Sequence, residues 1–278
     1  MHARKIKNIV KSLVAKFYGL LRLKRMRRIS IPILCYHSVQ ESGNYEGDAL
    51  KPKEFENHLK YFAGNHSVIS LKDAVASIKN GKINAPNPVV ITFDDGYEDN
   101  YNFVFPLLKK YKSHATIFVV TSFIEGNIKL INDPCFGALS WNQIQEMDHS
   151  EFVDIGAHTD THRILSQIGE QDIEQEIGLS KQKLESKLGR PVDLFAYPNG
   201  QKTDISEIAK ATVKMVGFDS ACATSWRSTH VAREIFTLNR IMISGDDTLG
   251  TLKAKVRGDF DYIYWVQEFR YLVSRIFN

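Results

Sequence analysis

The sequence predicts an α/β fold in which a parallel β-sheet closes into a barrel with helices packed outside it. From residue 30 onward, short apolar runs of β-branched and aromatic residues alternate with helical patterns. Seven or eight such units fit into roughly 215 residues, which favours a closed barrel over an open doubly wound sheet. The 278 residues, 43% hydrophobic and 24% charged, have the composition of a globular protein with a large core.

The strands and helices are expected to alternate along the chain, as parallel sheets require. The predicted strands cover residues 31–36, 67–70, 89–93, 115–119, 152–157, 194–197, 220–224 and 238–243. The predicted helices cover residues 54–62, 71–80, 102–111, 140–147, 172–188 and 204–216.

Two of these helices carry explicit start or stop signals. Ser140 and Gln143 form a capping box at the start of one helix. Gly189 and then Pro191 follow the long helix over 172–188, and this order of residues ends helices.

Three parts of the chain are distinguished by composition. Residues 1–29 are expected to form a basic amphipathic segment, residues 30–245 a single domain, and residues 246–278 a helical extension. The extension is aromatic and basic, and is expected to be either a helix packed on the domain or a second membrane-facing element.

The N-terminal segment concentrates the positive charge of the chain. Residues 1–28 carry ten Lys or Arg and no acid, beside an apolar stripe at helical spacing. This pattern predicts an interfacial helix on anionic lipid, with packing on its own domain as the alternative. Lys11 and Lys16 interrupt the apolar run, so a signal peptide or a membrane span fits poorly.

The charge distribution also sets expectations for partners and location. A basic arm for nucleic acid is not expected, because the rest of the chain is acidic overall. Without a clear signal peptide, the protein is expected to be cytoplasmic or peripheral at the inner face of the membrane.

Charged and imidazole side chains follow two of the predicted strands. Asp94 and Asp95 come directly after the strand over 89–93, and His158 and His162 follow the strand over 152–157. Ligands bind at the carboxyl ends of parallel strands, so these side chains are expected to meet. Two buried carboxylates side by side need a cation or a shared proton to offset their repulsion.

The HxxxH spacing predicts that both imidazoles lie on one side of a helical turn, where they can share a cation. Two neutral imidazoles and one carboxylate form a mixed site that keeps positions open for water and substrate. One aspartate can then bind the cation while its neighbour accepts the proton of an attacking water.

Two further strand ends carry candidate residues. In FAYPNG, residues 195–200, Pro198 fixes the backbone and the glycine frees it, so the turn is a structural turn or aims the Asn199 N–H at an oxyanion. His37 ends the first strand, and is either a core histidine or a general acid that gives a proton to a leaving amine.

Together, four motifs resemble those of the polysaccharide deacetylases, the carbohydrate esterase family 4 with the NodB homology domain. They are TFDDG at 92–96, HTDTH at 158–162, FAYPNG at 195–200 and CYHSV at 35–39. The resemblance spans residues 31 to about 245. It implies a distorted (β/α)7 barrel and divalent-metal-dependent removal of N-acetyl groups from amino sugars.

By motif, Asp94 resembles the catalytic base of the family. The residues that resemble its metal ligands are Asp95, His158 and His162. The early histidine, His37, matches the acid of the circularly permuted branch that acts on poly-N-acetylglucosamine. In that branch the turn after the proline supplies the oxyanion N–H, here on Asn199, with Tyr197 and Pro198 as neighbouring substrate-binding residues.

The chain also departs from the family pattern. Ala196 stands where many members have an arginine that orients the base, and Asn199 stands where an aromatic residue usually follows the proline. A late leucine-plus-histidine motif is replaced by LNRI at 238–241.

The resulting hypothesis is a metal-dependent N-deacetylase acting on a cell-surface glycan, or on its lipid-linked or nucleotide-linked precursor. One divalent cation is expected, Zn²⁺ first, with Co²⁺, Ni²⁺ or Mn²⁺ as alternatives. Two alternative hypotheses remain: a deformylase of a lipid-linked amino sugar, and a non-catalytic glycan-binding barrel.

Overall fold

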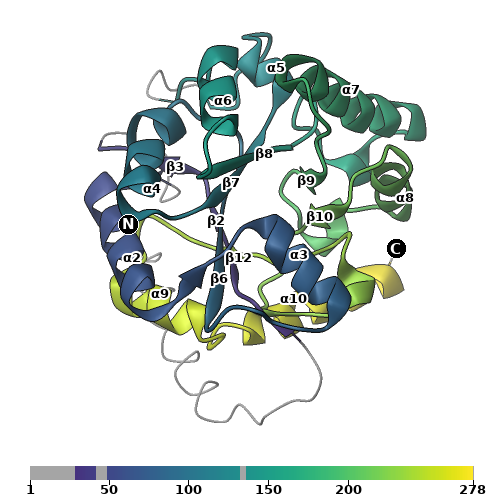
Figure 1. Cartoon of the computed structure of the whole chain (residues 1–278). Coiled ribbons are helices and arrows are strands. Elements are labelled where there is room, and N and C mark those ends of the chain that lie inside the picture. The colour runs from purple at the N-terminus through teal and green to yellow at the C-terminus, as the bar shows by residue number, and fades with distance from the viewer. Residues whose placement is uncertain (1–28, 42–48, 132–135, 278) are drawn as a thin grey trace.

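The structure, a computed structural model, describes residues 29–41, 49–131 and 136–277, with side chains up to Val273 (Figure 1). The predicted interfacial helix in residues 1–28 lies outside the described residues.

A parallel eight-stranded sheet forms the centre of the molecule, and helices surround it (Figure 1). Its strand order is β10-β9-β8-β7-β6-β2-β12, with β5 paired to β6. The strands are β2 (Ile33–Tyr36), β5 (Ser67–Val68), β6 (Pro88–Phe93), β7 (Ala115–Val119), β8 (Val153–Ala157), β9 (Leu194–Ala196), β10 (Ser220–Cys222) and β12 (Ile241–Met242). Most of these strands are buried on both faces, which explains their nearly continuous apolar sequences.

The two ends of the sheet approach each other. β10 and β12 lie at opposite ends of the strand order, and a parallel bridge joins Cys222 at the end of β10 to Leu238, just before β12. The sheet is therefore curled into a barrel, and the predicted distorted (β/α)7 fold is confirmed.

Two small pairings lie outside the barrel sheet. β1 (Ile29–Ser30) pairs antiparallel with β11 (Thr229–His230), so the start of the described chain lies beside residue 230. β3 (Ser38–Val39) pairs with β4 (Ala49–Leu50) directly after His37.

Successive residues along each strand enter different parts of the core, as the two-residue period of a strand requires. In β2, Leu34 belongs to the large cluster shared with the surrounding helices, whereas Ile33 belongs to a second cluster shared with α3. The helices are α2 (Pro52–Asn65), α3 (Leu71–Asn80), α4 (Phe105–Tyr111), α5 (Thr121–Ile124), α6 (Trp141–Asp148), α7 (Glu170–Leu188), α8 (Glu207–Met215), α9 (Leu249–Val256) and α10 (Tyr262–Phe277).

The predicted helix signals are confirmed. Ser140 and Gln143 exchange the hydrogen bonds of a capping box at the start of α6. α7 ends where Gly189 takes a left-handed conformation with φ 67°.

Three elements differ from the prediction. The helix expected over 102–111 begins as a π-helix at Asn100–Val104, whose wider turn sets Asp99 and Asn100 against the end of β2 and β3. The last barrel strand is shorter than 238–243, because Leu238 bridges to β10 before the chain pairs with β2. The tail forms two helices, α9 and α10.

Candidate metal centre and catalytic cavity

A cavity opens at the carboxyl ends of the barrel strands, where the sequence motifs converge. His37, Asp94, Asp95, His158, His162 and Asn199 line it together with Gln201, Thr224, Trp226, Met242 and Gln267. Six of the eight predicted site residues therefore share one cavity, and Tyr197 and Pro198 are not in its lining.

The Asp-Asp-Gly turn after β6 is tightly constrained. The Asp94 N–H donates to Tyr36 O at 3.0 Å, which extends the β2–β6 pairing by one residue. Asp95 then adopts φ 77°, a left-handed conformation that is strained for a residue with a side chain. Gly96 has φ 81°, and a Cβ there would lie 2.9 Å from Val119 Cγ1, so this position requires glycine.

The HTDTH segment forms an irregular turn, and the expected helical turn is wrong. Thr159 and His162 both have left-handed backbones, with φ 67° and 61°. The His162 N–H donates to Thr159 Oγ1 at 3.0 Å, a local bond that competes with helical pairing. This turn still brings the two rings together, with centroids 4.9 Å apart.

The buried carboxylate of Glu176 on α7 holds this turn in place. It accepts hydrogen bonds from the Asp160 N–H at 3.1 Å and the Thr161 N–H at 2.8 Å, and a further one from the Thr161 hydroxyl. The Asp160 N–H also donates to the Glu176 backbone oxygen at 3.0 Å, so Glu176 supplies the acceptors for two backbone donors that the strained turn cannot pair internally.

Asp95, His158 and His162 aim their donor atoms at one point. Asp95 Oδ1 lies 3.6 Å from His158 Nε2 and 3.4 Å from His162 Nε2. One donor atom from each of the three residues lies within 4.8 Å of the others. Asp95 Oδ1 is buried and has no hydrogen-bond partner among the described residues, so a ligand is needed to satisfy it.

The protonation state of His158 suits a metal ligand. Its Nδ1 lies 2.8 Å from Ala196 O, and because a carbonyl only accepts, Nδ1 carries the proton and Nε2 presents a lone pair. Burial lowers the pKa of His158 to about 4, so the ring is neutral at pH 7. Two imidazoles and a carboxylate with an unsatisfied oxygen fit a divalent cation such as Zn²⁺.

Asp94 occupies a different environment, bound to the fully buried Arg240. Arg240 Nη1 donates to Asp94 Oδ1 at 2.6 Å, and Nη2 donates to Oδ2 at 2.7 Å. The Cys35 thiol adds a bond to Oδ2 at 3.3 Å. Arg240 was not predicted as a site residue, and its signal in the sequence is a single arginine inside the apolar run LNRIMI, residues 238–243.

Arg240 controls the ionisation of Asp94. Burial alone would raise the pKa of this carboxyl, but the adjacent guanidinium lowers it well below its usual range. Asp94 is therefore ionised at neutral pH, with both oxygens held in one orientation. Burial raises the pKa of the Cys35 thiol, so Cys35 is a protonated donor here and not a ligand.

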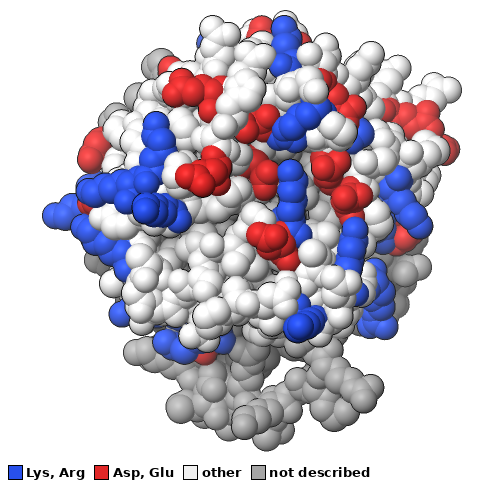
Figure 2. Space-filling model, in the orientation of Figure 1, with Lys and Arg blue, Asp and Glu red and all other residues white. Residues whose placement is uncertain are grey.

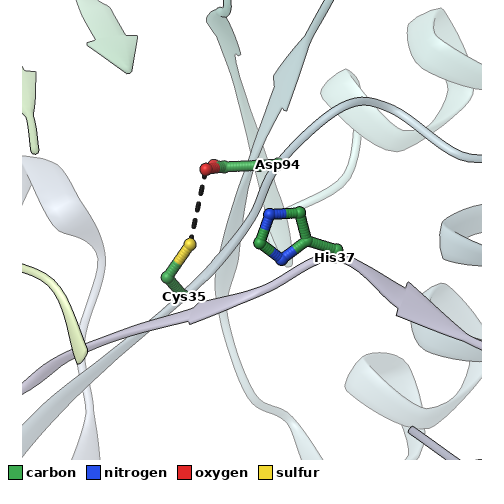
Figure 3. Close-up of side chains that lie close together, drawn as sticks. All are labelled: Cys35, His37 and Asp94. Atoms are coloured by element: carbon green, nitrogen blue, oxygen red, sulfur yellow. Dashed lines mark hydrogen bonds between the residues drawn. The ribbon is translucent and has the colours of Figure 1, made fainter. Parts of the chain in front are cut away.

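His37 lies beside Asp94, just after the end of β2. Figure 3 shows the side chains of Cys35, on β2, and His37, just after β2, close to Asp94. The donor atoms of Cys35, His37 and Asp94 lie within 4.8 Å of one another. The backbone of His37 is fixed from the π-helix, where the Asn100 side-chain amide donates to His37 O at 3.0 Å.

The FAYPNG turn divides its residues between the core and the cavity. The Tyr197 hydroxyl donates to Phe236 O at 3.1 Å, so this side chain packs away from the cavity. Asn199 lines the cavity with φ 55°, and its N–H donates to no acceptor among the described residues. Ala196 contributes its carbonyl oxygen, which orients His158.

The C-terminal extension also reaches the cavity. Gln267 of α10 lines it, and its side chain is fixed at both ends. Gln267 Oε1 accepts from the Trp226 N–H at 3.1 Å, and Nε2 donates to Thr224 O at 3.2 Å. The sequence analysis did not connect residues 246–278 with the site.

The rest of the surface is mixed in charge. Figure 2 shows Lys and Arg side chains interspersed with Asp and Glu over the face seen in Figure 1. In the described ranges, every helix is too short or too polar to cross a membrane.

The chain is similar to known proteins of one family. The profile of the family described as polysaccharide deacetylase matches residues 81–218. A Bacillus subtilis protein, YxkH, whose name assigns it to the polysaccharide deacetylases, is 28% identical over 80% of this chain and 74% of its own length. The poly-β-1,6-N-acetyl-D-glucosamine N-deacetylase of Staphylococcus aureus is 25% identical over 81% of this chain and 77% of its own.

Solved structures share the fold. A polysaccharide deacetylase from Bacillus cereus superposes with a TM-score of 0.67 at 26% identity, covering 82% of this chain and 69% of that chain. A Streptococcus pyogenes deacetylase in complex with acetate gives a TM-score of 0.73 at 24% identity, covering 82% of this chain and 99% of that chain.

Proposed function

Because the chain belongs to the polysaccharide deacetylase family, we propose that it is a metal-dependent hydrolase that removes N-acetyl groups from amino sugars. The substrate is a cell-surface polysaccharide, or the lipid-linked or nucleotide-linked precursor of one. The observation that carries this proposal is the contrast between two adjacent carboxylates. Asp94 is fully hydrogen-bonded to Arg240, whereas Asp95 Oδ1 is unsatisfied and faces two imidazoles.

Asp95, His158 and His162 would hold the cation. A divalent cation bound there would polarise the acyl oxygen and acidify a water molecule. Three protein ligands would leave coordination positions for water and substrate, as a catalytic site requires and a structural four-ligand site does not.

Asp94 acts as the general base. Its carboxylate accepts a proton from the water that attacks the acyl carbon, since Arg240 keeps it ionised and oriented. His158 Nε2 lies 3.9 Å from Asp94 Oδ2, so the base stands next to the residues that hold the cation.

His37 and Asn199 complete the reaction. As the C–N bond breaks, His37 donates a proton to the leaving nitrogen, and the products are acetate and a free amine. The Asn199 N–H, which has no acceptor among the described residues, donates to the oxygen that becomes negatively charged.

A β-1,6-linked N-acetylglucosamine polymer is the first substrate to test. Support comes from the Staphylococcus aureus relative, whose name specifies this polymer and which aligns over 81% of this chain. A precursor at a membrane surface is supported by the basic composition of residues 1–28.

The test compares two isosteric substitutions in neighbouring residues. Asp94→Asn is expected to lower acetate release from N-acetylglucosamine oligomers by about 10²–10⁴-fold while the protein still binds one metal ion. Asp95→Asn is expected to lower both the bound metal and the activity. Acetate is measured enzymatically, and metal is measured on the same samples by mass spectrometry.

Matched N-formyl and N-acetyl substrates distinguish the deformylase hypothesis from the deacetylase hypothesis. Faster release of formate than of acetate at equal substrate concentration would favour the deformylase. Nearly full activity of the Asp94→Asn protein would show that Asp94 is not the base. If the metal-loaded wild type hydrolysed none of these amides, the remaining hypothesis would be a non-catalytic glycan-binding barrel.

A further inference from the structure

Helix α10 contacts the protein through a mixed side that holds both polar and aromatic side chains. In a helix of a globular protein, the apolar stripe normally faces the core. In α10 the side chains that contact the barrel include Gln267, which bonds Thr224 O, and Glu268, which pairs with Lys202 at 2.7 Å. Tyr271 lies on the same side, with its ring 4.5 Å from Lys202 Nζ.

The opposite side of α10 is apolar and faces solvent. Its exposed large side chains are Trp265 (48%), Val266 (43%), Phe269 (68%) and Leu272 (56%). At about 100° per residue, Trp265, Phe269 and Leu272 fall on one stripe, and Val266 borders it. Four large apolar side chains on one helical face indicate a surface that another apolar phase covers.

The charges of α10 restrict what covers this face. Its charged residues are Glu268, Arg270 and Arg275. Glu268 is neutralised by Lys202, and Arg270 is exposed at the edge of the apolar stripe. The exposed side is therefore apolar and basic, and its complement is apolar and anionic.

Residues 1–28 do not complement this face, because they carry ten Lys or Arg and no acid. Two basic apolar segments repel each other, but both are attracted to an anionic lipid surface. The described chain begins close to the start of α10: β1 pairs with β11, and Ser228, next to β11, donates through its N–H to Asp261 at 2.9 Å, directly before α10.

We propose that the exposed face of α10, formed by Trp265, Val266, Phe269 and Leu272, docks on an anionic lipid bilayer. The aromatic side chains enter the boundary between headgroups and acyl chains, where Trp and Phe are favoured. Arg270 extends from the edge of the stripe to the lipid phosphates. This surface is separate from the residues proposed for catalysis.

Docking through α10 would also position the cavity. Gln267 lines the cavity from the protein-facing side of the same helix. The lipid surface and the cavity therefore contact opposite sides of one helix, so a bilayer-bound molecule holds its catalytic cavity near the membrane.

The experiment uses the full chain with vesicles of phosphatidylcholine and phosphatidylglycerol, compared with phosphatidylcholine alone. The variant Trp265→Ser/Phe269→Ser/Leu272→Ser is expected to lower the partition coefficient by at least about tenfold. Arg270→Glu is expected to lower it by about tenfold on the anionic vesicles only. The matched control is Ile208→Ser/Met215→Ser on α8, whose side chains are 43% and 70% exposed, and it is expected to partition as the wild type.

A second measurement locates the contact. Brominated lipid is expected to quench tryptophan fluorescence in the wild type and not in Trp265→Phe, which keeps the apolar face. Acetate release from a soluble oligomer is expected to stay at the wild-type rate in every α10 variant, so failure of the catalytic proposal would be seen separately.

Three results would overturn the docking proposal. The first is a triple variant that partitions as well as the wild type, which would assign any binding to residues 1–28. The second is absence of wild-type binding to anionic vesicles. The third is a wild-type dimer that light scattering shows to dissociate in the triple variant, which would identify a second copy as the occupant.

Discussion

Asp94 and Asp95 are adjacent in the chain, but their carboxylates differ in what surrounds them. Asp94 accepts two bonds from Arg240 and one from Cys35, while Asp95 Oδ1 accepts none from the described residues. The left-handed backbone at Asp95, with φ 77°, turns the two side chains toward different neighbours. The geometry therefore favours one carboxylate as a fixed base and the other as a ligand.

Removal of Arg240 tests the first of these roles. Arg240→Met leaves a buried carboxylate without its cation, and is expected to lower the free energy of unfolding by about 3–5 kcal/mol. It is also expected to raise the pKa of Asp94, which moves the acidic limb of the activity profile to higher pH. Chemical denaturation and the pH dependence of acetate release measure the two effects.

The pH dependence of stability gives an independent check. The folded-state pKa of Asp94 lies below its ordinary value of 3.8, so its contribution to stability is present above pH 4 and is lost as the pH falls below that. Arg240→Met is expected to lack this part of the acid dependence. Arg240→Lys, which keeps the charge but not the two parallel bonds, is the control, and equal stability of the Met variant and the wild type would contradict the prediction.

At the scale of single residues, the sequence predicts those site residues that belong to a local motif. Asp94, Asp95, His158 and His162 lie at strand ends, and strand ends can be located from apolar runs. Arg240 could not be assigned, because its partner lies 146 residues away and one charged residue in an apolar run does not name that partner. Tyr197 was predicted near the substrate, but its hydroxyl bonds Phe236 O in the core.

At the scale of elements, the turn that carries the proposed histidine ligands depends on a helix that supplies no ligand. α7 brings Glu176 to the backbone of Asp160 and Thr161, between the two histidines. Glu176→Gln keeps the shape of the side chain but removes the charge that strengthens both bonds. It is expected to weaken metal affinity by about tenfold, measured by calorimetry on the metal-free protein.

The control for Glu176 is Glu174→Gln, which changes an exposed carboxylate on the same helix. It is expected to bind metal with wild-type affinity. If Glu176→Gln lowered thermal stability but left metal affinity unchanged, the carboxylate would support the fold and not the position of the ligands.

Element boundaries were predictable where local signals are strong. The helix over 71–80 and the strand over 115–119 match α3 and β7. The π-helix at Asn100–Val104 was not predictable, because the bonds of Asp99 to the Val39 N–H and of Asn100 to His37 O form only in the folded chain. The exposure of the apolar stripe of α10 is likewise a tertiary effect, since periodicity predicts the stripe and not the side it faces.

At the scale of the whole molecule, a cation in the proposed site would join strands that are not neighbours. Asp95 follows β6 and the two histidines follow β8, and β7 lies between these strands. Binding of Zn²⁺ at 100 times its dissociation constant is expected to raise the free energy of unfolding by about 2.7 kcal/mol. Thermal unfolding with zinc and after chelation measures the shift.

The same titration with Asp95→Asn is the control for this prediction. Because that variant lacks the unsatisfied oxygen, zinc is expected to change its unfolding temperature much less. An equal shift in the variant and the wild type would mean that zinc stabilises the protein at another place.

The segment that closes the barrel has a consequence for heat sensitivity. Leu238 bridges to β10, Ile241 pairs with β2, and Arg240 between them holds Asp94. Local opening of these few residues would move the Arg240 guanidinium away from Asp94, the proposed base, before the other strands separate. Warming is then expected to stop acetate release at a temperature where amide hydrogens in the central strands still resist exchange. Cooling is expected to restore the activity, because the rest of the barrel has stayed folded.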